Sequence, residues 1–272
     1  MVLGVLVNLD KNTDIALKIK EVKDMGFSSC QIACWDMDCH NEEIAAKVKA
    51  ALDEYGVSVS TFWAGWSGPQ AWNFTEGPTT LGIVPTEYRA TRLRELKAGS
   101  DFAKMIGVSQ LATHAGFLPE SPAAEGYSDL IAAIKDIGAY CKQNGQYFLF
   151  ETGQETPVTL LRVIEDAGLD NLAVNLDPAN LILYGKANPV DALDLIGKYV
   201  RDVHGKDGLY PTNGRELGKE TPLGAGKANF PRLVARLKEL GYDGPITIER
   251  EISGEEQKRD IISAKAILEQ LI

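Results

Sequence analysis

Short apolar runs rich in β-branched and aromatic residues alternate with longer segments of helical periodicity along the whole chain. The strand-like runs are Leu3–Leu9, Ser28–Cys34, Val57–Phe62, Gln110–Thr113, Tyr147–Glu151, Leu172–Asp177, Val200–His204 and Pro245–Glu249. The helical segments are Thr13–Met25, Asn41–Tyr55, Glu87–Ile106, Tyr127–Asn144, Phe230–Leu240 and Glu255–Leu271, with two more that begin near Pro157 and Pro189. Strict alternation of this kind is typical of a parallel sheet with right-handed crossovers.

Eight strand–helix units predict an α/β fold, a closed (β/α)8 TIM barrel, and the 272 residues fit the usual size of about 250. We expect residues 1–272 to form one domain of this type, with an open, doubly wound sheet as the alternative. Two long loops interrupt the pattern, one before Pro85 and one from Gly205 to Lys227. Loops of this length in a compact domain usually serve a function.

Four residues of metal-binding type end successive strand-like runs in the second half of the chain. They are Glu151, Asp177, His204 and Glu249. Because the C-terminal ends of the strands meet at the mouth of a TIM barrel, we expect these side chains to converge there. Three carboxylates and one imidazole suit Mn²⁺, Mg²⁺, Co²⁺ or Zn²⁺, and the imidazole favours Mn²⁺ over Mg²⁺. The pattern therefore predicts one divalent metal ion.

The charge of the chain argues against polyanionic partners. The formal net charge is −10 and the isoelectric point is about 4.9, so nucleic acid and anionic membranes are unfavourable partners. The N-terminus lacks the basic region of a signal peptide, and no apolar run reaches the ~20 residues of a membrane span. We expect a soluble cytoplasmic protein with a small-molecule ligand.

The cysteines leave a second metal hypothesis open. Cys30, Cys34 and Cys39 lie close together in the sequence, but they form no C-x-x-C pair. We expect reduced, packed thiols, and a zinc site made of Cys34, Cys39 and His40 is the alternative.

Four short motifs carry a resemblance to a known family. They are Phe150–Glu155 (FETGQE), Asn175–Asn180 (NLDPAN), Asp202–Asp207 (DVHGKD) and Ile246–Glu251 (ITIERE). In this order they resemble the sugar phosphate isomerase/epimerase family, the xylose isomerase-like TIM barrels that include ketose 3-epimerases and inositol-catabolism enzymes. The resemblance extends over essentially the whole chain.

The resemblance implies roles for the four strand-end residues. Glu151, Asp177, His204 and Glu249 match the metal ligands, and Glu151 and Glu249 also match the acid/base pair of the epimerases. The implied substrate is a sugar or a polyol-derived ketone. A metal that chelates its carbonyl and hydroxyl acidifies the C–H between them and stabilises an enediolate. One carboxylate then removes the proton and the other returns it.

The chain departs from the epimerase pattern at two positions. Asn180 stands where the epimerases usually have a histidine that contacts the substrate; an asparagine can still bind a hydroxyl group. The family's substrate-binding arginine has no match at the usual spacing, and Arg215 is the nearest candidate, with a solvated loop arginine as the alternative.

Other candidate substrate-binding residues follow from their positions. Lys206 follows His204 by two residues, so along a strand it shares the same face. It could stabilise an oxyanion or pair with Asp207 or Glu251. His114 ends a strand-like run next to that of Glu151, and Gln154 follows Glu151 in its loop.

All four tryptophans lie between the second strand and the long loop after the third: Trp35, Trp63, Trp66 and Trp72. Aromatic rings stack on the apolar faces of sugars, so we expect at least Trp63 to line the substrate site. The alternatives are a dry core within the loop and a contact in a homo-oligomer, since exposed aromatic residues also mark protein interfaces.

The segment Gly224–Lys227 (GAGK) resembles part of a phosphate-binding loop. It fails the full pattern, because Thr221 replaces the first glycine and Ala228 replaces the serine or threonine. Phosphate sites of TIM barrels follow strands seven and eight, so a phosphorylated substrate remains an alternative.

One fold hosts many reactions, so several functions stay open. The leading hypothesis is a metal-dependent isomerase or epimerase. The alternative is a metal-dependent lyase, either an inosose-type dehydratase or a 3-keto-glycoside deglycosylase. An endonuclease of the abasic-site type would need more ligands than the three histidines supply. A non-catalytic sugar-binding protein would not need the full ligand set.

Overall fold

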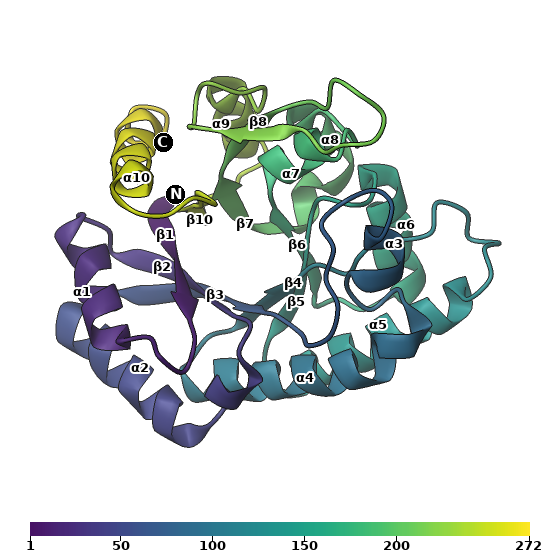
Figure 1. Ribbon diagram of the computed structural model, residues 1–272, viewed down its shortest axis with the longest axis horizontal. Coiled ribbons are helices and arrows are strands. Elements are labelled where there is room, and N and C mark those ends of the chain that lie inside the picture. The colour runs from purple at the N-terminus through teal and green to yellow at the C-terminus, as the bar shows by residue number, and fades with distance from the viewer.

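The eight long parallel strands close into a barrel, which excludes the open sheet (Figure 1). The computed structural model describes residues Met1–Ile272. The barrel order is β1-β10-β7-β6-β5-β4-β3-β2. The strands are β1 (Val2–Leu9), β2 (Ser29–Cys34), β3 (Ser58–Ala64), β4 (Gln110–Thr113), β5 (Tyr147–Glu151), β6 (Leu172–Leu176), β7 (Val200–Gly205) and β10 (Pro245–Ile248).

Helices connect the strands and surround the barrel. They are α1 (Ile15–Asp24), α2 (Glu42–Tyr55), α3 (Gly77–Thr80), α4 (Thr86–Met105), α5 (Tyr127–Gln143), α6 (Pro157–Ala167), α7 (Pro178–Leu183), α8 (Pro189–Ile196), α9 (Phe230–Glu239) and α10 (Glu255–Glu269). Two 3₁₀ turns cover Met37–Cys39 and Gly197–Tyr199. None of the helices is both long enough and apolar enough to cross a lipid bilayer.

Local sequence signals set many of the helix ends. Asn41, Thr156 and Asn188 cap α2, α6 and α8 because their side chains accept hydrogen bonds from free backbone N–H groups of the first turn. Gly56 ends α2 in the left-handed conformation that glycine adopts without strain.

Two short helices and one hairpin lie outside the eight-unit prediction. The long loop after β3 contains the single turn α3, and α7 begins directly after Asp177, ahead of the helix expected near Pro189. The loop after β7 forms an antiparallel hairpin of β8 (Asp207–Leu209) and β9 (Lys219–Thr221). β3 also extends past its predicted end, so Trp63 lies in the strand. The two helices and the hairpin are too short for a periodicity to appear in the sequence.

The interior of the barrel has an apolar layer and a polar layer. The apolar layer is a cluster of five residues: Ala33, Trp63, Ala112, Leu149 and Ala173. The polar layer centres on Asp202 of β7, whose carboxylate accepts hydrogen bonds from Ser60, Thr61 and Thr247. A larger apolar core lies between the barrel and the helices. Parallel register places the C-terminal ends of β5, β6, β7 and β10 at one mouth.

Candidate metal centre and adjacent cavity

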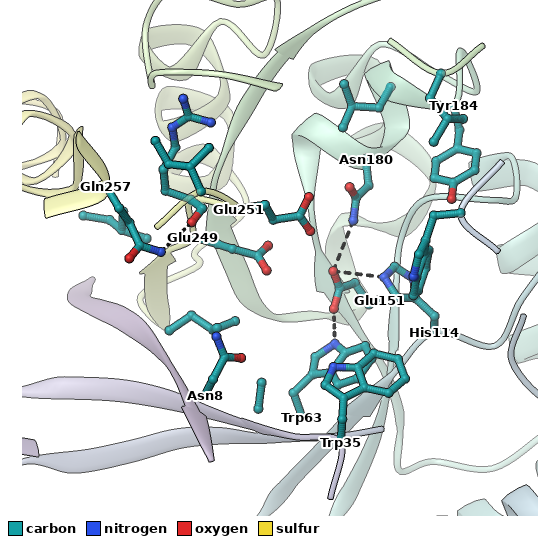
Figure 2. A pocket seen from close by; sticks show the side chains of 18 of the residues that line it. Asn8, Trp35, Trp63, His114, Glu151, Asn180, Tyr184, Glu249, Glu251 and Gln257 are labelled. Carbon is teal, nitrogen blue, oxygen red and sulfur yellow. Dashed lines mark hydrogen bonds and ion pairs between the residues drawn. The ribbon is translucent and has the colours of Figure 1, made fainter. Parts of the chain in front are cut away.

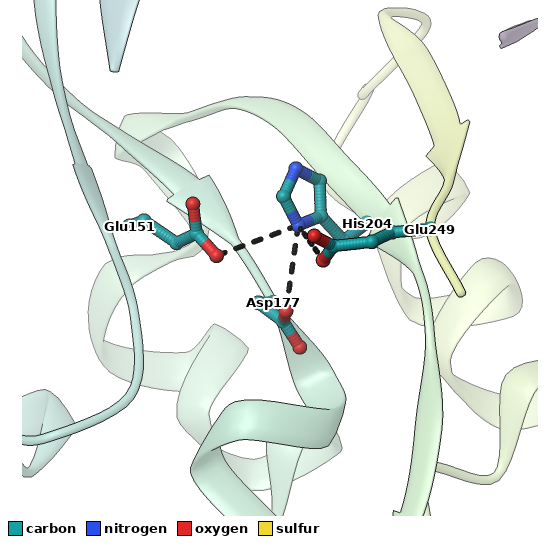
Figure 3. Close-up of side chains that lie close together, drawn as sticks. All are labelled: Glu151, Asp177, His204 and Glu249. Carbon is teal, nitrogen blue, oxygen red and sulfur yellow. Dashed lines mark hydrogen bonds and ion pairs between the residues drawn. The ribbon is translucent and has the colours of Figure 1, made fainter. Parts of the chain in front are cut away.

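The four predicted ligands converge at the mouth of the barrel (Figure 3). Glu151, Asp177, His204 and Glu249 each offer one ligand atom, and these atoms lie within 4.8 Å of one another. Asp177 also caps α7, because its Oδ1 accepts a hydrogen bond from the backbone of Asn180 at 2.8 Å. Its Oδ2 is left to face Nδ1 of His204 at 3.4 Å. The local fold after β6 thus orients one ligand.

Glu151 is held by three side chains on the cavity side (Figure 2). The indole N–H of Trp63 donates to Oε2. The amide of Asn180 donates to Oε1 at 3.2 Å, and Nε2 of His114 lies 3.4 Å from the same oxygen. Trp63, Asn180 and His114 were predicted to bind substrate, and in this structure their polar groups contact the carboxylate of Glu151.

Glu249 is held from the other side of the cluster. Its Oε2 lies 3.0 Å from Nδ1 of His204 and 3.1 Å from Nζ of Lys206. The ammonium group of Lys206 also lies 3.4 Å from Asp177 and 2.9 Å from Glu251. Lys206 is buried, so this cation offsets part of the charge of the three carboxylates. Of the two salt-bridge partners predicted for Lys206, Glu251 forms an ion pair with it and Asp207 does not.

The far side of His204 is fixed by a residue that the sequence analysis missed. Oε1 of Gln31 lies 2.9 Å from Nε2 of His204. The amide nitrogen of Asn175 lies 3.0 Å from the same Nε2, so two amide side chains hold this edge of the ring while Nδ1 faces the carboxylates. Gln31 in turn donates to Asp202 at 3.3 Å. The one sequence signal was a glutamine in the otherwise small and apolar run Ser29–Cys34.

The charges of the cluster shift the pKa values of its members in opposite directions. Burial alone would raise the pKa of Glu151 and Glu249, but nearby cations outweigh it and hold both pKa values below the usual range. Burial alone would lower the pKa of His204 and Lys206, but the carboxylates raise both pKa values well above normal. Without a bound ion, the cluster therefore favours a protonated His204 between ionised carboxylates.

The donor set fits a divalent cation. Three carboxylate oxygens and the Nδ1 of His204 point to one spot, and no thiol is among them. The alternative zinc site is wrong. Cys34, Cys39 and His40 do not form a group that could hold a metal ion, and the ring of His40 packs against Phe62 and Phe102 at centroid distances of 5.6 Å.

A cavity of about 530 Å³ opens above the cluster. Its lining combines aromatic with polar side chains: Trp35, Trp63, Trp72, Tyr184, His114, Glu151, Gln154, Asn180, Glu249 and Glu251. Figure 2 shows Glu151 and Glu249 approaching this space from different sides. Trp66 is buried beside Trp35 and does not line the cavity.

The structure separates the predicted substrate-binding residues into two groups. Trp63, His114, Gln154 and Asn180 line the cavity, and Lys206 lies in the acidic cluster below it. The structure does not bring Arg215 there. It is exposed in the connection between β8 and β9 and does not line the cavity, although Leu217 of the same connection does.

Tyr184 was missed by the sequence analysis. It follows the short helix α7, and its buried hydroxyl group lacks a hydrogen-bond partner. Only the unpredicted α7 brings this side chain to the cavity, so the sequence held no usable signal for it.

Comparisons with known proteins agree with this geometry. The sequence profile of the family described as xylose isomerase-like TIM barrel matches residues 19–271. A crystal structure of a xylose isomerase domain protein from Planctomyces limnophilus is 36% identical with a TM-score of 0.93, and the alignment covers 99% of this chain and 96% of that one. The chain belongs to the xylose isomerase-like TIM barrel family.

Other known proteins match this chain at lower identity or over a smaller part of its length. A D-tagatose 3-epimerase-like protein is 21% identical with a TM-score of 0.75, over 100% of this chain and 97% of that one. An uncharacterised protein of Methanocaldococcus jannaschii is 32% identical over 118 residues, which span 43% of this chain and only 37% of the relative. Other structures with this fold are those of ketose 3-epimerases and a dehydratase. At such low identity these structures show the fold alone.

Proposed function

We propose that this protein is a divalent-metal-dependent sugar isomerase or epimerase that works by proton transfer next to a carbonyl group. The observation that carries the proposal is the placement of two carboxylates at the floor of the cavity. Glu151 ends β5 and Glu249 follows β10, with β6 and β7 between them in the barrel. Their side chains therefore reach a bound ligand from two sides (Figure 2).

This arrangement suits the transfer of a proton to and from carbon. One carboxylate can remove a proton from a substrate held between the two, and the other can deliver one from its own side. Trp63, Asn180 and His114 hold the carboxylate of Glu151 in place, and Lys206 and His204 hold that of Glu249. Fixed orientation of this kind keeps both groups near the reacting carbon.

Glu151, Asp177, His204 and Glu249 would hold the metal ion. When bound, a divalent ion supplies Lewis-acid polarisation of a carbonyl group. We favour Mn²⁺ because an imidazole joins three oxygen donors in the cluster.

The cavity lining supports a polyol as the substrate. Trp35, Trp63 and Trp72 provide aromatic surface for the C–H faces of a sugar. Gln154 and Tyr184 are buried on the cavity wall, and polar atoms of both side chains lack partners. Hydroxyl groups of a sugar are the partners we expect for them.

The Glu151→Gln variant tests the proposal. It keeps an oxygen at the ligand position but removes the base, so we expect a loss of about 10²–10⁴-fold in exchange of the substrate C–H with solvent deuterium. Nuclear magnetic resonance in deuterated water with a panel of ketoses and the Mn²⁺-loaded enzyme measures this exchange. The control is Glu120→Gln, an exposed carboxylate outside the cavity. Exchange that survives both Glu151→Gln and a chelator would contradict the proposal.

One observation favours a lyase as the second candidate. Asn180 stands where the epimerases usually have a histidine. Its amide group donates to Glu151 at 3.2 Å and accepts from Lys206 at 3.4 Å, so its polar atoms contact residues of the acidic cluster. If the same proton removal were followed by loss of a β-leaving group, the enzyme would be an inosose-type dehydratase or a 3-keto-glycoside deglycosylase. The product mass distinguishes the two candidates, since only a lyase releases water or an aglycone.

A further inference from the structure

The glycine-containing loop between β9 and α9 directs its backbone N–H groups to one point. Gly224 and Gly226 each donate to one carboxylate oxygen of Asp207, both at 3.0 Å. Ala228 and Gly208 donate to the other oxygen, at 2.9 and 2.8 Å. Four converging N–H groups form the kind of nest that binds anions in proteins. Here the anion is a side chain of the chain itself.

Asp207 fills this nest completely. The residue is only 2% exposed, and no cation forms a salt bridge with it. Gly226 approaches so closely that an added Cβ would lie 2.1 Å from Oδ1 of Asp207. The loop therefore fits this carboxylate and has no room for a second anion beside it.

The nest lies where TIM barrels bind phosphate groups. The loop belongs to the connection after β7, on the C-terminal face of the barrel, in the part of the molecule that leads to α9 (Figure 1). It is also next to the candidate metal centre, because Asp207, Lys206 and Glu249 line one small cavity. A phosphate group on a substrate in the main cavity would need a site of this kind.

We infer that Asp207 is a specificity-determining residue that occupies the anion site of the barrel, so that the substrate is a sugar without a phosphate group. That the substrate is a sugar rests on the proposed function. The occupation of the anion site by Asp207 does not depend on it. A phosphate group at this loop would face the buried carboxylate and find all four N–H donors engaged. Both effects oppose its binding.

The Asp207→Ala variant tests the inference with inorganic phosphate as the probe. Removal of the carboxylate leaves four N–H groups without this partner, those of Gly208 and Ala228 buried and those of Gly224 and Gly226 part-buried, so we expect the variant to lose stability and to regain it when phosphate binds. The unfolding temperature of the variant should rise with phosphate concentration and then saturate, compared with chloride at equal ionic strength. That of the wild type should not change. By calorimetry, phosphate should bind the wild type at least about tenfold more weakly than the variant.

A matched control separates the nest from the mere loss of a carboxylate. Asp36 also accepts two backbone N–H bonds, from Lys11 and Asp38 at 3.1 Å each, but with an open, solvated geometry. Asp36→Ala should show no response to phosphate. If Asp207→Ala does not fold in chloride, its refolding yield with and without phosphate gives the same readout.

The outcomes are distinct. Phosphate binding of equal strength by the wild type and Asp207→Ala, or a variant that responds to phosphate in neither stability nor refolding, would overturn the inference. Turnover of sugar phosphates by the wild type in preference to free sugars would overturn it as well. If no ketose exchanges its protons but Asp207→Ala gains phosphate affinity, only the proposed function fails.

Discussion

At the scale of single residues, the orientation of His204 depends on a side chain from the opposite part of the barrel. Oε1 of Gln31 in β2 lies 2.9 Å from Nε2 of His204, and Gln31 in turn donates to Asp202. Mutation of a residue that hydrogen-bonds the far nitrogen of a metal-binding histidine commonly lowers metal affinity by about 10- to 100-fold.

The Gln31→Leu variant should therefore bind Mn²⁺ about 10–100-fold more weakly, because the imidazole loses a partner that orients its ring. Isothermal titration calorimetry measures the affinity. Gln110→Leu is the matched control, since Gln110 is also buried in the polar layer but contacts Ser60 and Thr61 rather than His204. Equal affinities for the two variants would contradict this role of Gln31.

The buried imidazole of His40 should make the stability of the folded state depend on pH. Its ring nitrogens lack hydrogen-bond partners, and burial lowers its pKa to about 4. The unfolded chain protonates the same residue near pH 6.5, so between these values the unfolded state binds more protons. Stability should fall as the pH drops from about 6.5 towards 4, by up to about 3 kcal/mol.

The His40→Leu variant should lose this part of the acid sensitivity. Urea unfolding at pH 7 and at pH 4.5 measures it for both proteins. An unchanged difference between the two pH values in the variant would show that His40 is not the titrating group.

At the scale of elements, one arginine holds the long loop between β3 and α4. The guanidinium group of Arg92 donates to four carbonyl oxygens of this loop: Ser67, Pro69, Thr80 and Gly82. It also lies 4.0 Å from the ring centre of Trp66. Trp72 of the same loop lines the cavity, so the position of the loop and that of a cavity wall are linked.

Arg92→Met should cost about 3 kcal/mol, because it removes a buried side chain and leaves four carbonyl groups without this donor, that of Gly82 buried. It should also raise KM more than it lowers kcat, since the affected wall binds substrate and lies away from the two carboxylates. Urea unfolding and limited proteolysis of the loop check the first effect. Arg94→Met is the control: Arg94 is exposed on the same helix and donates only to Thr91. Similar losses in both variants would contradict the anchoring role.

Short elements explain where the sequence prediction failed. The positions of the eight strands follow from their apolar pattern, and the ends of most helices follow from caps such as Asn41 and Thr156. The single turn α3 and the hairpin of β8 and β9 are stabilised by contacts with other parts of the chain. Arg215 lies exposed in this hairpin, which agrees with the alternative of a solvated loop arginine.

At the scale of the whole molecule, the candidate metal centre joins strands that are far apart in the chain. Its ligands come from β5, the end of β6, β7 and the end of β10, so an ion would connect about a hundred residues of sequence. The three buried carboxylates repel one another, and Lys206 and His204 offset this only in part. A divalent ion should therefore stabilise the folded state.

Mn²⁺ should raise the unfolding temperature and a chelator should lower it. Binding stabilises by about 2.7 kcal/mol when the free ion is a hundredfold above Kd. Differential scanning calorimetry with and without Mn²⁺ measures the effect, and Asp177→Asn should show a smaller response. An unfolding temperature that is the same with Mn²⁺ and with chelator would argue against a metal centre in this cluster.

The sequence by itself determined the barrel and the four residues at its mouth. Strand and helix periods repeat locally, and parallel strands must bring Glu151, Asp177, His204 and Glu249 to one face. Only the tertiary structure decided what surrounds them. Gln31 reaches His204, and Asp207 meets the N–H groups of Gly224 and Gly226, through contacts between distant parts of the chain. Such contacts depend on register and loop packing, which leave no periodic pattern in the sequence.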